Sequence, residues 1–446
     1  MKKTFFGTDG IRAESNSPIL NGRTMMKLGM ALGKHFTNGN HRHTAVIGKD
    51  TRLSGYMIEQ AVTSGLLSMG MDVFLFGPLP TPGVAMLTKS MRADLGIMIT
   101  ASHNKFTDNG LKIFDKNGNK LSDEIELEIE RLMDTRLEEN LIEPEKIGRA
   151  KRVDDANGRY IEFLKNTFPS KQRLEGLKIV VDCANGASYL SAPIVLWELG
   201  AEVIQIGVKP DGLNINKECG STDTNLLSKK VRENNADIGL ALDGDGDRLI
   251  ICDENGEIID GDQILGLLAL HLKENNSLKN NKVVGTLMTN VGLENKLGDN
   301  SIRLIRASVG DRYVKEEMLK RELNLGGEQS GHIILKDFTS SGDGIVVALQ
   351  VLSILKEKKL KVSNLLDIFQ PAPQKLMNFK VNSKDVLDME DTKQFLSDCN
   401  KKIQDQGRIV ARMSGTEPLL RVMIECSEQS KLNELSDNIN NHFSKL

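Results

Sequence analysis

The sequence predicts an α/β protein made of three related α/β domains and a smaller C-terminal α+β domain. Three observations lead to this fold class. Apolar, strand-like runs alternate with segments of helical periodicity through most of the chain. Three blocks, each of about 100 residues or more, repeat an apolar strand followed by a turn that contains Gly or Asn. A Pro-Ala-Pro break at residues 371–373 then precedes a segment with a different order of elements.

The first block predicts an α/β domain over residues 1–155. Apolar runs indicate strands at Thr44–Gly48, Met71–Phe76 and Asp94–Ile99, and helical spacing indicates helices at Tyr56–Met69 and Thr81–Met91. Two charged segments are expected to form helices that cover and connect the first two blocks, at Glu124–Glu139 and Arg152–Leu164.

The next two blocks predict domains over residues 156–258 and 259–370. The second block reads as a strand at Leu177–Val181, a helix at Ser191–Leu199 and a strand at Ala236–Leu242. The third reads as a helix at Asp262–Lys273, a strand at Lys282–Leu287 and a helix at Gly344–Lys358. The three blocks share this pattern but no fixed sequence period.

The last block predicts a separate α+β domain over residues 374–446. The expected order is strand, helix, strand, strand, helix, at Lys375–Val381, Asp391–Asp405, Arg408–Met413, Leu419–Cys426 and Lys431–Ser444. Because both ends of the preceding break are proline, we expect a short, stiff connection to this domain.

Composition limits the possible functions. The chain has 446 residues, 39% hydrophobic and 27% charged, as in ordinary globular proteins, and its formal net charge of -3 argues against a nucleic-acid partner. No apolar run approaches the roughly 20 residues that span a membrane, and we expect no secretory leader, because Gly7 and Asp9 interrupt the apolar residues near the N-terminus. The five cysteines are scattered, and Cys183 and Cys252 lie in strand-like runs, as expected of core residues. We therefore expect a cytoplasmic protein, a monomer or homodimer, that acts on a small molecule.

An acidic loop between two apolar runs predicts a divalent-metal site. Asp243, Asp245 and Asp247 alternate with glycines and are followed by Arg248. Three carboxylates so close repel one another unless a cation lies among them, and hard oxygen ligands suit Mg²⁺, or Mn²⁺ or Ca²⁺. A solvated acidic turn is one alternative. An EF-hand loop is another; Arg248 at its glycine position argues against it, although Glu254 falls at its twelfth place.

A second loop predicts a nucleophile. The apolar strand that begins at Gly96 runs directly into Thr-Ala-Ser-His-Asn, which ends at Asn104. Ligands of open α/β sheets bind beyond the carboxyl ends of strands, so Ser102 stands where its hydroxyl can attack phosphorus or carry a phosphoryl group, and His103 titrates near neutral pH. Polar residues that only cap the strand are the alternative. A Ser-His-Asp hydrolase is disfavoured because no Gly-x-Ser-x-Gly elbow surrounds Ser102.

The two loops are most informative together. A phosphoserine dianion at Ser102 would supply a further ligand to a cation held by the three aspartates. Three carboxylates and a phosphoserine leave a net charge of roughly -3 after one Mg²⁺, so basic groups must converge on the site. Arg248, Lys112 and Arg12 are the candidates, although each taken alone is more typical of a surface cation.

Two further loops carry groups that bind sugars and phosphates. In Gly326–His332, Glu328 and Ser330 can bind sugar hydroxyls and His332 a hydroxyl or a phosphate, although a plain glycine-rich hairpin is also compatible. The second loop, Arg412–Pro418, joins a guanidinium to two hydroxyls and free amides, which together form a phosphate cradle made by Arg412, Ser414, Gly415 and Thr416. An ordinary turn with a surface arginine is the alternative.

In combination and order, these motifs resemble those of the phosphohexomutase superfamily, over nearly the whole chain. The resemblance rests on Phe6–Arg12, Gly48–Arg52 with Ser54–Tyr56, Thr100–Asn104, Asp108–Lys112, Asp243–Arg248, Gly327–His332, and Arg412–Pro418 with Arg421. One position departs from the family pattern, because Lys105 stands where a proline is usual. A lysine loosens this loop, since it lacks the fixed φ of proline.

The resemblance implies four domains around a central active-site cleft. It implies that Ser102 is a phosphoserine, that Asp243, Asp245 and Asp247 hold Mg²⁺ with it, and that Lys112 and Arg248 help to move the hydroxyl proton. The loop of Arg412, Ser414, Gly415 and Thr416 would hold the phosphate that does not react.

The expected activity is the interconversion of glucosamine 6-phosphate and glucosamine 1-phosphate, an intramolecular phosphoryl transfer that feeds UDP-N-acetylglucosamine and cell-wall synthesis. A sugar 1,6-bisphosphate would be the bound intermediate and an activator of the dephosphorylated enzyme. The first motif and the Gly-Glu-Gln-Ser-Gly-His loop favour the amino sugar. A mutase of glucose or mannose phosphates, a metal-dependent phosphatase and a non-enzymatic sugar-phosphate sensor are the alternatives; retention of Ser102, the aspartates and Lys112 argues against the sensor.

Overall fold

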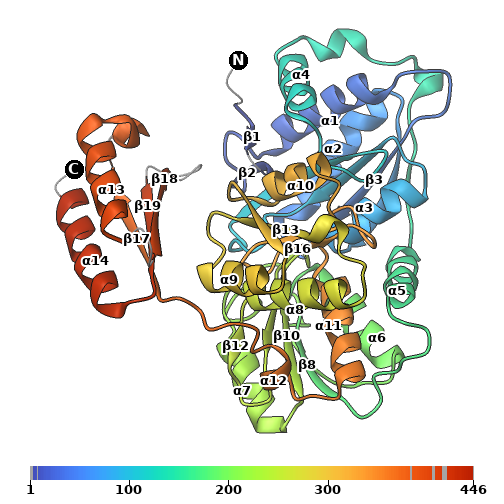
Figure 1. The fold of residues 1–446 in the computed structure, drawn as a ribbon. Coiled ribbons are helices and arrows are strands. Elements are labelled where there is room, and N and C mark those ends of the chain that lie inside the picture. The colour runs from blue at the N-terminus through green and yellow to red at the C-terminus, as the bar shows by residue number, and fades with distance from the viewer. Residues whose placement is uncertain (1–3, 8, 382–383, 404–406, 414–418, 445–446) are drawn as a thin grey trace.

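A computed structural model of the chain describes residues 4–7, 9–381, 384–403, 407–413 and 419–444. Within these residues the strands form four sheets, one in each of four successive parts of the chain. Figure 1 shows that the first three parts are stacked against one another, whereas the fourth, which we call domain IV, stands to one side at the end of an extended connection. None of the described helices is both long enough and apolar enough to span a membrane.

Domain I is built on a mixed sheet of seven strands in the order β1-β2-β6-β5-β3-β4-β7. The strands are β1 (Phe6–Gly7), β2 (Gly10–Glu14), β3 (Thr44–Lys49), β4 (Asp72–Pro78), β5 (Leu95–Ile99), β6 (Asp108–Asp115) and β7 (Ala150–Arg152). The helices are α1 (Gly22–Phe36), α2 (Ser54–Ser68), α3 (Thr81–Ser90) and α4 (Asp123–Met133). Strands β3, β4 and β5 are parallel, and β6 returns antiparallel beside β5. The loop after β5 therefore emerges beside the start of β6 and of α2.

Domain II contains five strands in the order β12-β11-β10-β8-β9. They are β8 (Lys178–Asp182), β9 (Glu202–Ile206), β10 (Ile238–Leu242), β11 (Leu249–Cys252) and β12 (Ile258–Ile259), with helices α5 (Ala156–Thr167), α6 (Ser191–Glu198) and α7 (Asn225–Asn234). Strands β10 and β11 form an antiparallel pair from Gly239↔Cys252 to Leu242↔Leu249. The acidic loop is thus the turn of a buried hairpin.

Domain III contains four strands in the order β14-β13-β15-β16. They are β13 (Lys282–Thr286), β14 (Arg303–Ala307), β15 (Leu325–Gly327) and β16 (Ile333–Leu335), with helices α8 (Gly261–Glu274), α9 (Val291–Asp299), α10 (Asp311–Lys320), α11 (Gly344–Lys358) and α12 (Val362–Leu365). The glycine-rich loop predicted to bind sugar connects β15 to β16, which are antiparallel.

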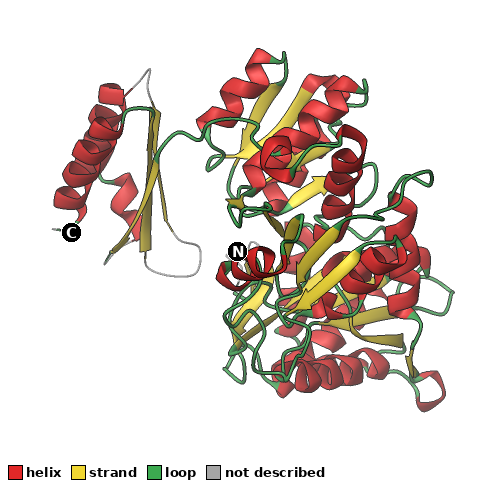
Figure 2. Ribbon diagram, turned by 90° about the horizontal axis from the view of Figure 1, so that it is seen from below, coloured by secondary structure: helices red, strands yellow, loops and turns green. Residues whose placement is uncertain are grey.

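Domain IV is a three-stranded antiparallel sheet in the order β17-β19-β18. Its elements are β17 (Gln374–Lys380), β18 (Gly407–Met413), β19 (Leu419–Cys426), α13 (Glu390–Ile403) and α14 (Gln429–Phe443). Figures 1 and 2 show both helices on the side of the sheet that faces away from the other domains. The opposite face of the sheet is therefore directed toward them.

The buried side chains show which domains are packed as one body. One apolar cluster runs from Val46 in β3 through Val181 in β8 to Leu349 in α11, so it is shared by domains I, II and III. Domain IV has a separate cluster, which includes Phe379 and Phe443. Burial of apolar area is the main source of folding free energy, so domain IV is stabilised by its own core.

The contacts of domain IV with domain III are polar. Arg408 donates hydrogen bonds to the carbonyl oxygens of Leu287 (2.7 Å) and Thr289 (2.6 Å). The buried carboxylate of Glu425 accepts from the backbone N–H of Val291 at 2.9 Å and pairs with Arg408 at 2.6 Å. These hydrogen bonds attach the sheet of domain IV to residues 287–291 of domain III, while the apolar cores of the two domains remain separate.

The predicted fold class is confirmed, and several element boundaries are corrected. The helix predicted at Glu124–Glu139 ends at Met133 and is followed by a short 3-10 turn. The helix predicted from Arg152 begins only at Ala156, because residues 150–152 pair with β4 as an edge strand. The elements that were not predicted include helices α1 and α10 and strand β6. All five cysteines are buried and unpaired, as expected for Cys183 and Cys252.

Candidate active site

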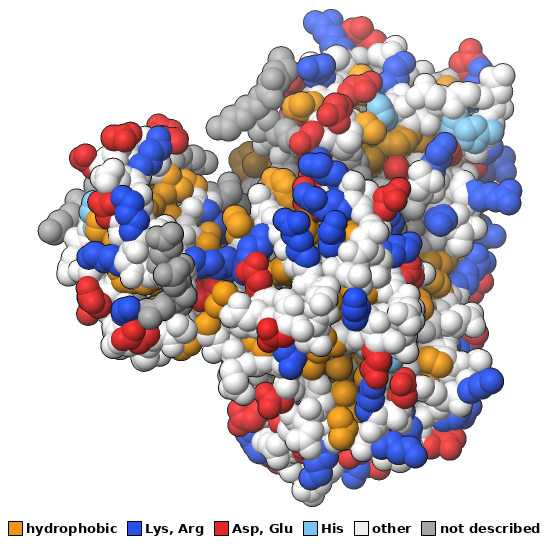
Figure 3. Space-filling view, in the orientation of Figure 1, with side chains coloured by type: hydrophobic (Ala, Val, Ile, Leu, Met, Phe, Trp, Pro, Cys, Tyr) orange, Lys and Arg blue, Asp and Glu red, His pale blue; other side chains and the backbone are white. Residues whose placement is uncertain are grey.

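A cleft of about 800 Å³ lies between the first three domains and domain IV. Figure 3 shows basic side chains where domain IV meets the rest of the molecule. The predicted site residues that line the cleft are Arg12, Ser102, His103, Asp247, Arg248, Glu328, Ser330, His332, Arg412 and Arg421. Three others, Lys112, Asp243 and Asp245, are buried. Ser414, Gly415 and Thr416 lie outside the described residues. The structure thus brings together side chains from all four domains.

Ser102 lies in the turn that follows β5 and has a left-handed backbone, with φ of 50°. A non-glycine residue in this conformation is held there by its surroundings. The Thr100 hydroxyl accepts a hydrogen bond from the N–H of Ser102 at 2.8 Å, and the Ser102 hydroxyl donates to Asp243 Oδ2 at 2.5 Å. Oγ also lies 3.5 Å from Nδ1 of His103. The hydroxyl is therefore aimed directly at the acidic loop.

Arg52 fixes the backbone of the loop that contains Ser102, residues 100–108, which we call the serine loop. Its side chain is fully buried, and Nε pairs with Asp50 Oδ2 at 2.9 Å. The rest of the guanidinium donates to the carbonyl oxygens of Ser102 (2.9 Å), Asn104 (2.9 Å), Lys105 and Asp108 (3.1 Å). A planar fork with five N–H groups suits such a set of acceptors.

The same arrangement bears on Lys105, the departure from the family pattern. Its carbonyl oxygen also accepts from the N–H of Asp108 at 3.1 Å. Asn216 of domain II donates to the carbonyls of Ser102 (2.9 Å) and Asn104 (3.0 Å). The loop is therefore tied down by hydrogen bonds from Arg52 and Asn216, which do not depend on a proline at position 105.

The acidic loop fits closely against the serine loop. Asp243, Asp245 and Asp247 are all buried, and one oxygen from each lies within 4.8 Å of the others. A Cβ on Gly244 would lie 2.5 Å from the carbonyl oxygen of Ser102, so only glycine permits this approach. Oδ1 of Asp245 and Oδ1 of Asp247 are buried and have no hydrogen-bond partner among the described residues. Buried carboxylate oxygens in this state are what a hard cation requires, so the loop fits Mg²⁺.

Lys112 supplies positive charge from β6. Its Nζ lies 2.8 Å from both Asp245 Oδ2 and Asp247 Oδ2, and 3.7 Å from Asp9 Oδ2. Burial alone would lower the pKa of Lys112, but these carboxylates outweigh it and raise the pKa well above its usual value. Lys112 is therefore a fixed ammonium beneath the cleft.

The charged groups around Ser102 shift one another's pKa values. Burial opposes the charge of Arg248, but Asp243 and Asp247 raise the pKa of its guanidinium. Burial, together with repulsion from Arg248 and Arg12, lowers the pKa of His103 to about 3. Burial and the two neighbouring aspartates raise the pKa of Asp243 well above its usual value. The raised pKa of Asp243 shows that Lys112 and Arg248 only partly offset the repulsion among the three carboxyl groups, as expected of a site that takes up a further cation.

The sugar loop is joined to the acidic loop by backbone contacts. Arg248 and His332 form an antiparallel bridge, and the N–H of Leu249 donates to the carbonyl of Gly331 at 3.1 Å. A Cβ on Gly331 would lie 2.1 Å from the carbonyl oxygen of Leu249, and its φ is +89°, so glycine is needed there. His332 Nδ1 lies 3.5 Å from Asp247 Oδ1. Glu328, which burial leaves with a raised pKa, accepts from the N–H of Gly310 at 3.0 Å.

Domain IV presents two arginines to the cleft. Arg412 and Arg421 are direct partners across β18 and β19. Burial and repulsion from Arg421 lower the pKa of Arg412. Like charges placed opposite each other destabilise a sheet, so this pair indicates an anion-binding position.

Sequence reasoning missed four charged residues of the site: Arg52, Asp9, Lys120 and Asp311. Arg52 and Asp9 lie in motifs quoted above but carried no predicted role. Lys120 pairs with both Asp9 and Asp311, which joins domain I to domain III at the cleft, and Asp311 lies 3.7 Å from Nε2 of His332. No local pattern identifies Lys120 or Asp311, because their partners are distant in the sequence.

Comparison with known families identifies the class of protein. Domain models of phosphoglucomutase/phosphomannomutase match α/β/α domain I at residues 3–140, domain II at 158–256, domain III at 260–372 and the C-terminal domain at 376–442. The chain belongs to the phosphoglucomutase/phosphomannomutase family.

Within this family, the chain is similar to proteins named phosphoglucosamine mutase. It is 54% identical to that of Parvibaculum lavamentivorans and 53% identical to that of Maricaulis maris, over 98% of this chain and of each relative. Among solved structures, it resembles a phosphoglucomutase/phosphomannomutase family protein from Burkholderia thailandensis, with a TM-score of 0.82 and 23% identity over 98% of this chain and 96% of the other. It also resembles N-acetylphosphoglucosamine mutase from Aspergillus fumigatus in complex with GlcNAc-6P and magnesium, with a TM-score of 0.66 and 18% identity over 99% of this chain and 95% of the other.

Proposed function

We propose that this protein interconverts glucosamine 6-phosphate and glucosamine 1-phosphate through a phosphoserine at position 102. One observation carries the proposal: the Ser102 hydroxyl lies 2.5 Å from the buried acidic loop, at a cleft that also contains the arginine pair of domain IV. The relatives named phosphoglucosamine mutase support the amino sugar as the substrate.

The first half-reaction transfers the phosphoryl group of Ser102 to the free hydroxyl of the sugar phosphate. The sugar oxygen forms a new bond to phosphorus, the bond between phosphorus and Oγ breaks, and the product is a 1,6-bisphosphate. Lys112 and Arg248 stabilise charge on the transferring oxygens and help to move the proton of the sugar hydroxyl to Oγ of Ser102, which becomes a hydroxyl again. Such positioning and charge stabilisation account for most of the catalysis of phosphoryl transfer.

Mg²⁺ belongs to this proposal because of the acidic loop. Asp243, Asp245 and Asp247 would hold it together with the phosphoserine, and it would act as a Lewis acid on the phosphoryl oxygens. Three aspartates and a phosphoserine of about -2 carry more negative charge than one Mg²⁺ neutralises. Lys112, Arg248 and Arg12 supply the remainder.

The cleft has one end at which a phosphate reacts with Ser102 and another that binds the phosphate that is not reacting. Glu328, Ser330 and His332 would bind the sugar hydroxyls. Arg412 and Arg421, with the adjoining loop at 414–416, would hold the phosphate that is not reacting. After the first transfer, the bisphosphate turns around so that its other phosphate reaches Ser102. A cleft of about 800 Å³ is in the range that accommodates a small ligand of this kind.

The test compares products, substrates and the phosphorylated residue. Enzyme incubated with glucosamine, glucose or mannose 6-phosphate should form the 1-phosphate fastest from glucosamine, with little inorganic phosphate. Mass spectrometry should find the phosphoryl group on Ser102. Ser102→Ala should lose activity even with added bisphosphate but still bind substrate. Release of phosphate as the main product, or full activity with phosphate on another residue, would refute the proposal.

A further inference from the structure

A second cavity, of about 750 Å³, lies outside the catalytic cleft. Its walls come from α3 of domain I, α5, α10 and the residues that follow β16. The Ser340 hydroxyl donates to the carbonyl of Gly118 at 2.9 Å and so joins domain III to the turn after β6 at this cavity. Among the residues that the structure describes, none that lines this cavity also lines the catalytic cleft. Its volume is typical of a pocket for a small molecule.

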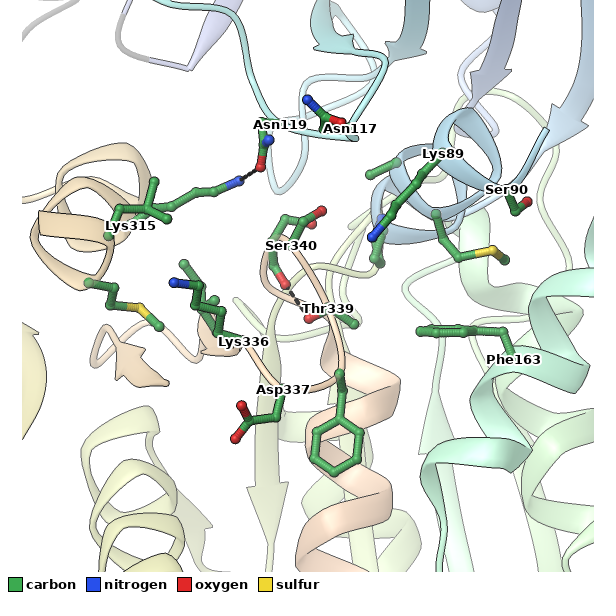
Figure 4. Close-up of a pocket in the computed structure, with 18 residues that line it drawn as sticks. Lys89, Ser90, Asn117, Asn119, Phe163, Lys315, Lys336, Asp337, Thr339 and Ser340 are labelled. Atoms are coloured by element: carbon green, nitrogen blue, oxygen red, sulfur yellow. Dashed lines mark hydrogen bonds between the residues drawn. The ribbon is translucent and has the colours of Figure 1, made fainter. Parts of the chain in front are cut away.

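Three lysines from separate elements line this cavity: Lys89 of α3, Lys315 of α10 and Lys336, which follows β16. Lys315 donates to Asn119 Oδ1 at 2.9 Å, and Figure 4 shows Lys89 extending from the other side of the pocket. Lys89 and Lys336 form no side-chain hydrogen bond or ion pair with the described residues. Figure 3 shows basic side chains gathered on the face that carries α10.

The lysines are not neutralised from within the cavity. Asp337 is the only acidic side chain among the described residues that line it, and Asn324 donates to its carboxylate at 2.6 Å while Lys279 lies 3.8 Å away. Burial, with repulsion from Lys120 and Lys336, lowers the pKa of Lys315 to about 8, although Asp311 and Asp115, which lie outside the cavity lining, act in the opposite direction. Like charges held together in this way are relieved by an anion.

Part of the cavity wall is apolar. Phe163 of α5 and Phe338 contribute aromatic rings, and Met86 and Leu319 contribute aliphatic surface. Leu319 is 51% exposed and Phe338 37% exposed, so both leave apolar surface accessible at this wall. A free sugar phosphate, with hydroxyls on every side, does not match this wall. A ligand that joins phosphate groups to a flat ring with apolar faces, as a nucleotide does, matches both the lysines and this wall.

We propose that this cavity is a binding site for a nucleotide, separate from the catalytic cleft. The phosphates would lie among Lys89, Lys315 and Lys336, and the base would pack against Phe163. Ammonium groups bind phosphate as point charges, and bases stack on aromatic side chains.

Isothermal titration calorimetry with ADP tests the proposal. The titration uses full-length enzyme in magnesium-free buffer with saturating glucosamine 6-phosphate, so that turnover stops and the catalytic cleft is occupied. ADP should still bind. The double variant Lys89→Ala, Lys336→Ala should have an affinity for ADP that is lower by about tenfold or more, because two of the three cations are lost. Lys116→Ala, which removes an exposed lysine outside the cavity, should leave the affinity unchanged.

The apolar wall has its own control. Phe163→Leu keeps a large apolar side chain but removes the aromatic face, so it should weaken the binding of ADP and leave the binding of pyrophosphate unaffected. Each variant should retain the melting temperature and isomerase activity of the parent, which separates loss of the site from loss of the fold. Absence of ADP binding once the cleft is filled, equal binding by the double lysine variant, or pyrophosphate binding as tightly as ADP would overturn the proposal.

Discussion

Arg52→Lys should separate the positioning of the nucleophile from its chemistry. The guanidinium of Arg52 does not line the cleft, but it donates to four backbone carbonyls of the serine loop and pairs with Asp50. Lysine keeps the charge and can retain the ion pair. Its single nitrogen cannot reach all four carbonyls, so we expect at least two of these hydrogen bonds to be lost.

The magnitude follows from the kind of bond. A hydrogen bond from a charged donor contributes about 1.5–3 kcal/mol, so two would contribute roughly 3–6 kcal/mol. Asn216 still donates to two of the same carbonyls, so we expect the lower end of that range, about 3 kcal/mol, in stability. A displacement of Ser102 by about 1 Å should lower kcat by about 100-fold.

The assay measures kcat and KM for glucosamine 6-phosphate, together with the fraction of enzyme phosphorylated on Ser102. We expect a large decrease in kcat with little change in KM, because the phosphate-binding arginines of domain IV are untouched. Arg42→Lys is the matched control, since Arg42 makes a comparable paired contact with Asp72 but is exposed. If Arg52→Lys retains kcat within about threefold, hydrogen bonds from Arg52 do not position the nucleophile.

Three further changes test other parts of the molecule. Asp245→Asn should keep the melting temperature but weaken Mg²⁺ in calorimetry and lower turnover by about 100-fold or more, since an anionic ligand is lost; unchanged Mg²⁺ affinity would contradict the metal assignment. Arg412→Ala should raise KM and release free bisphosphate, at a cost of about 2–4 kcal/mol in binding; an assay that finds neither effect would remove this arginine from the phosphate site. Burial raises the pKa of Asp262 from its usual 3.8 to about 7. The folded state therefore holds this proton more tightly than the unfolded state, and stability should fall as pH rises from about 4 to 7, by up to about 4 kcal/mol. Asp262→Asn should reduce that fall in denaturant titrations at pH 5 and pH 8, and an equal fall in both proteins would show that Asp262 does not cause it.

Strands with continuous apolar runs were predictable because both faces of these sheets are covered. The run at residues 94–99 corresponds to β5, and the run at 236–242 to β10. Helix α1 was not predicted, although the sequence contains a signal for its start: Asn21 is the N-cap residue, and its side chain accepts a hydrogen bond from the N–H of Thr24. Strand β6 was harder, because Lys112 interrupts its apolar pattern, and that lysine is buried only because Asp245 and Asp247 meet it from another domain.

The candidate site was predictable where chemistry is concentrated in a short segment. In the Asp243–Arg248 and Thr100–Asn104 loops, consecutive residues are enough to predict the function of the loop. The role of Arg52 could not be predicted in this way, because the backbone carbonyls that it contacts lie 50 or more positions away in the sequence. The same holds for Lys120, whose contact with Asp311 spans 191 positions. Residue types in sequence do not reveal such pairs, which exist only once the domains have packed.

The separate core of domain IV has a thermodynamic consequence. Because Phe379 and Phe443 belong to a cluster that the other domains do not share, loss of this domain's structure need not destabilise the remaining three. The fraction of molecules in which Arg412 is correctly placed is then an equilibrium of its own. Apparent affinity for a sugar phosphate is the intrinsic affinity multiplied by that fraction. Temperature, denaturant and substitutions confined to residues 374–444 should therefore weaken substrate binding before they disturb the pairing of Ser102 with Asp243.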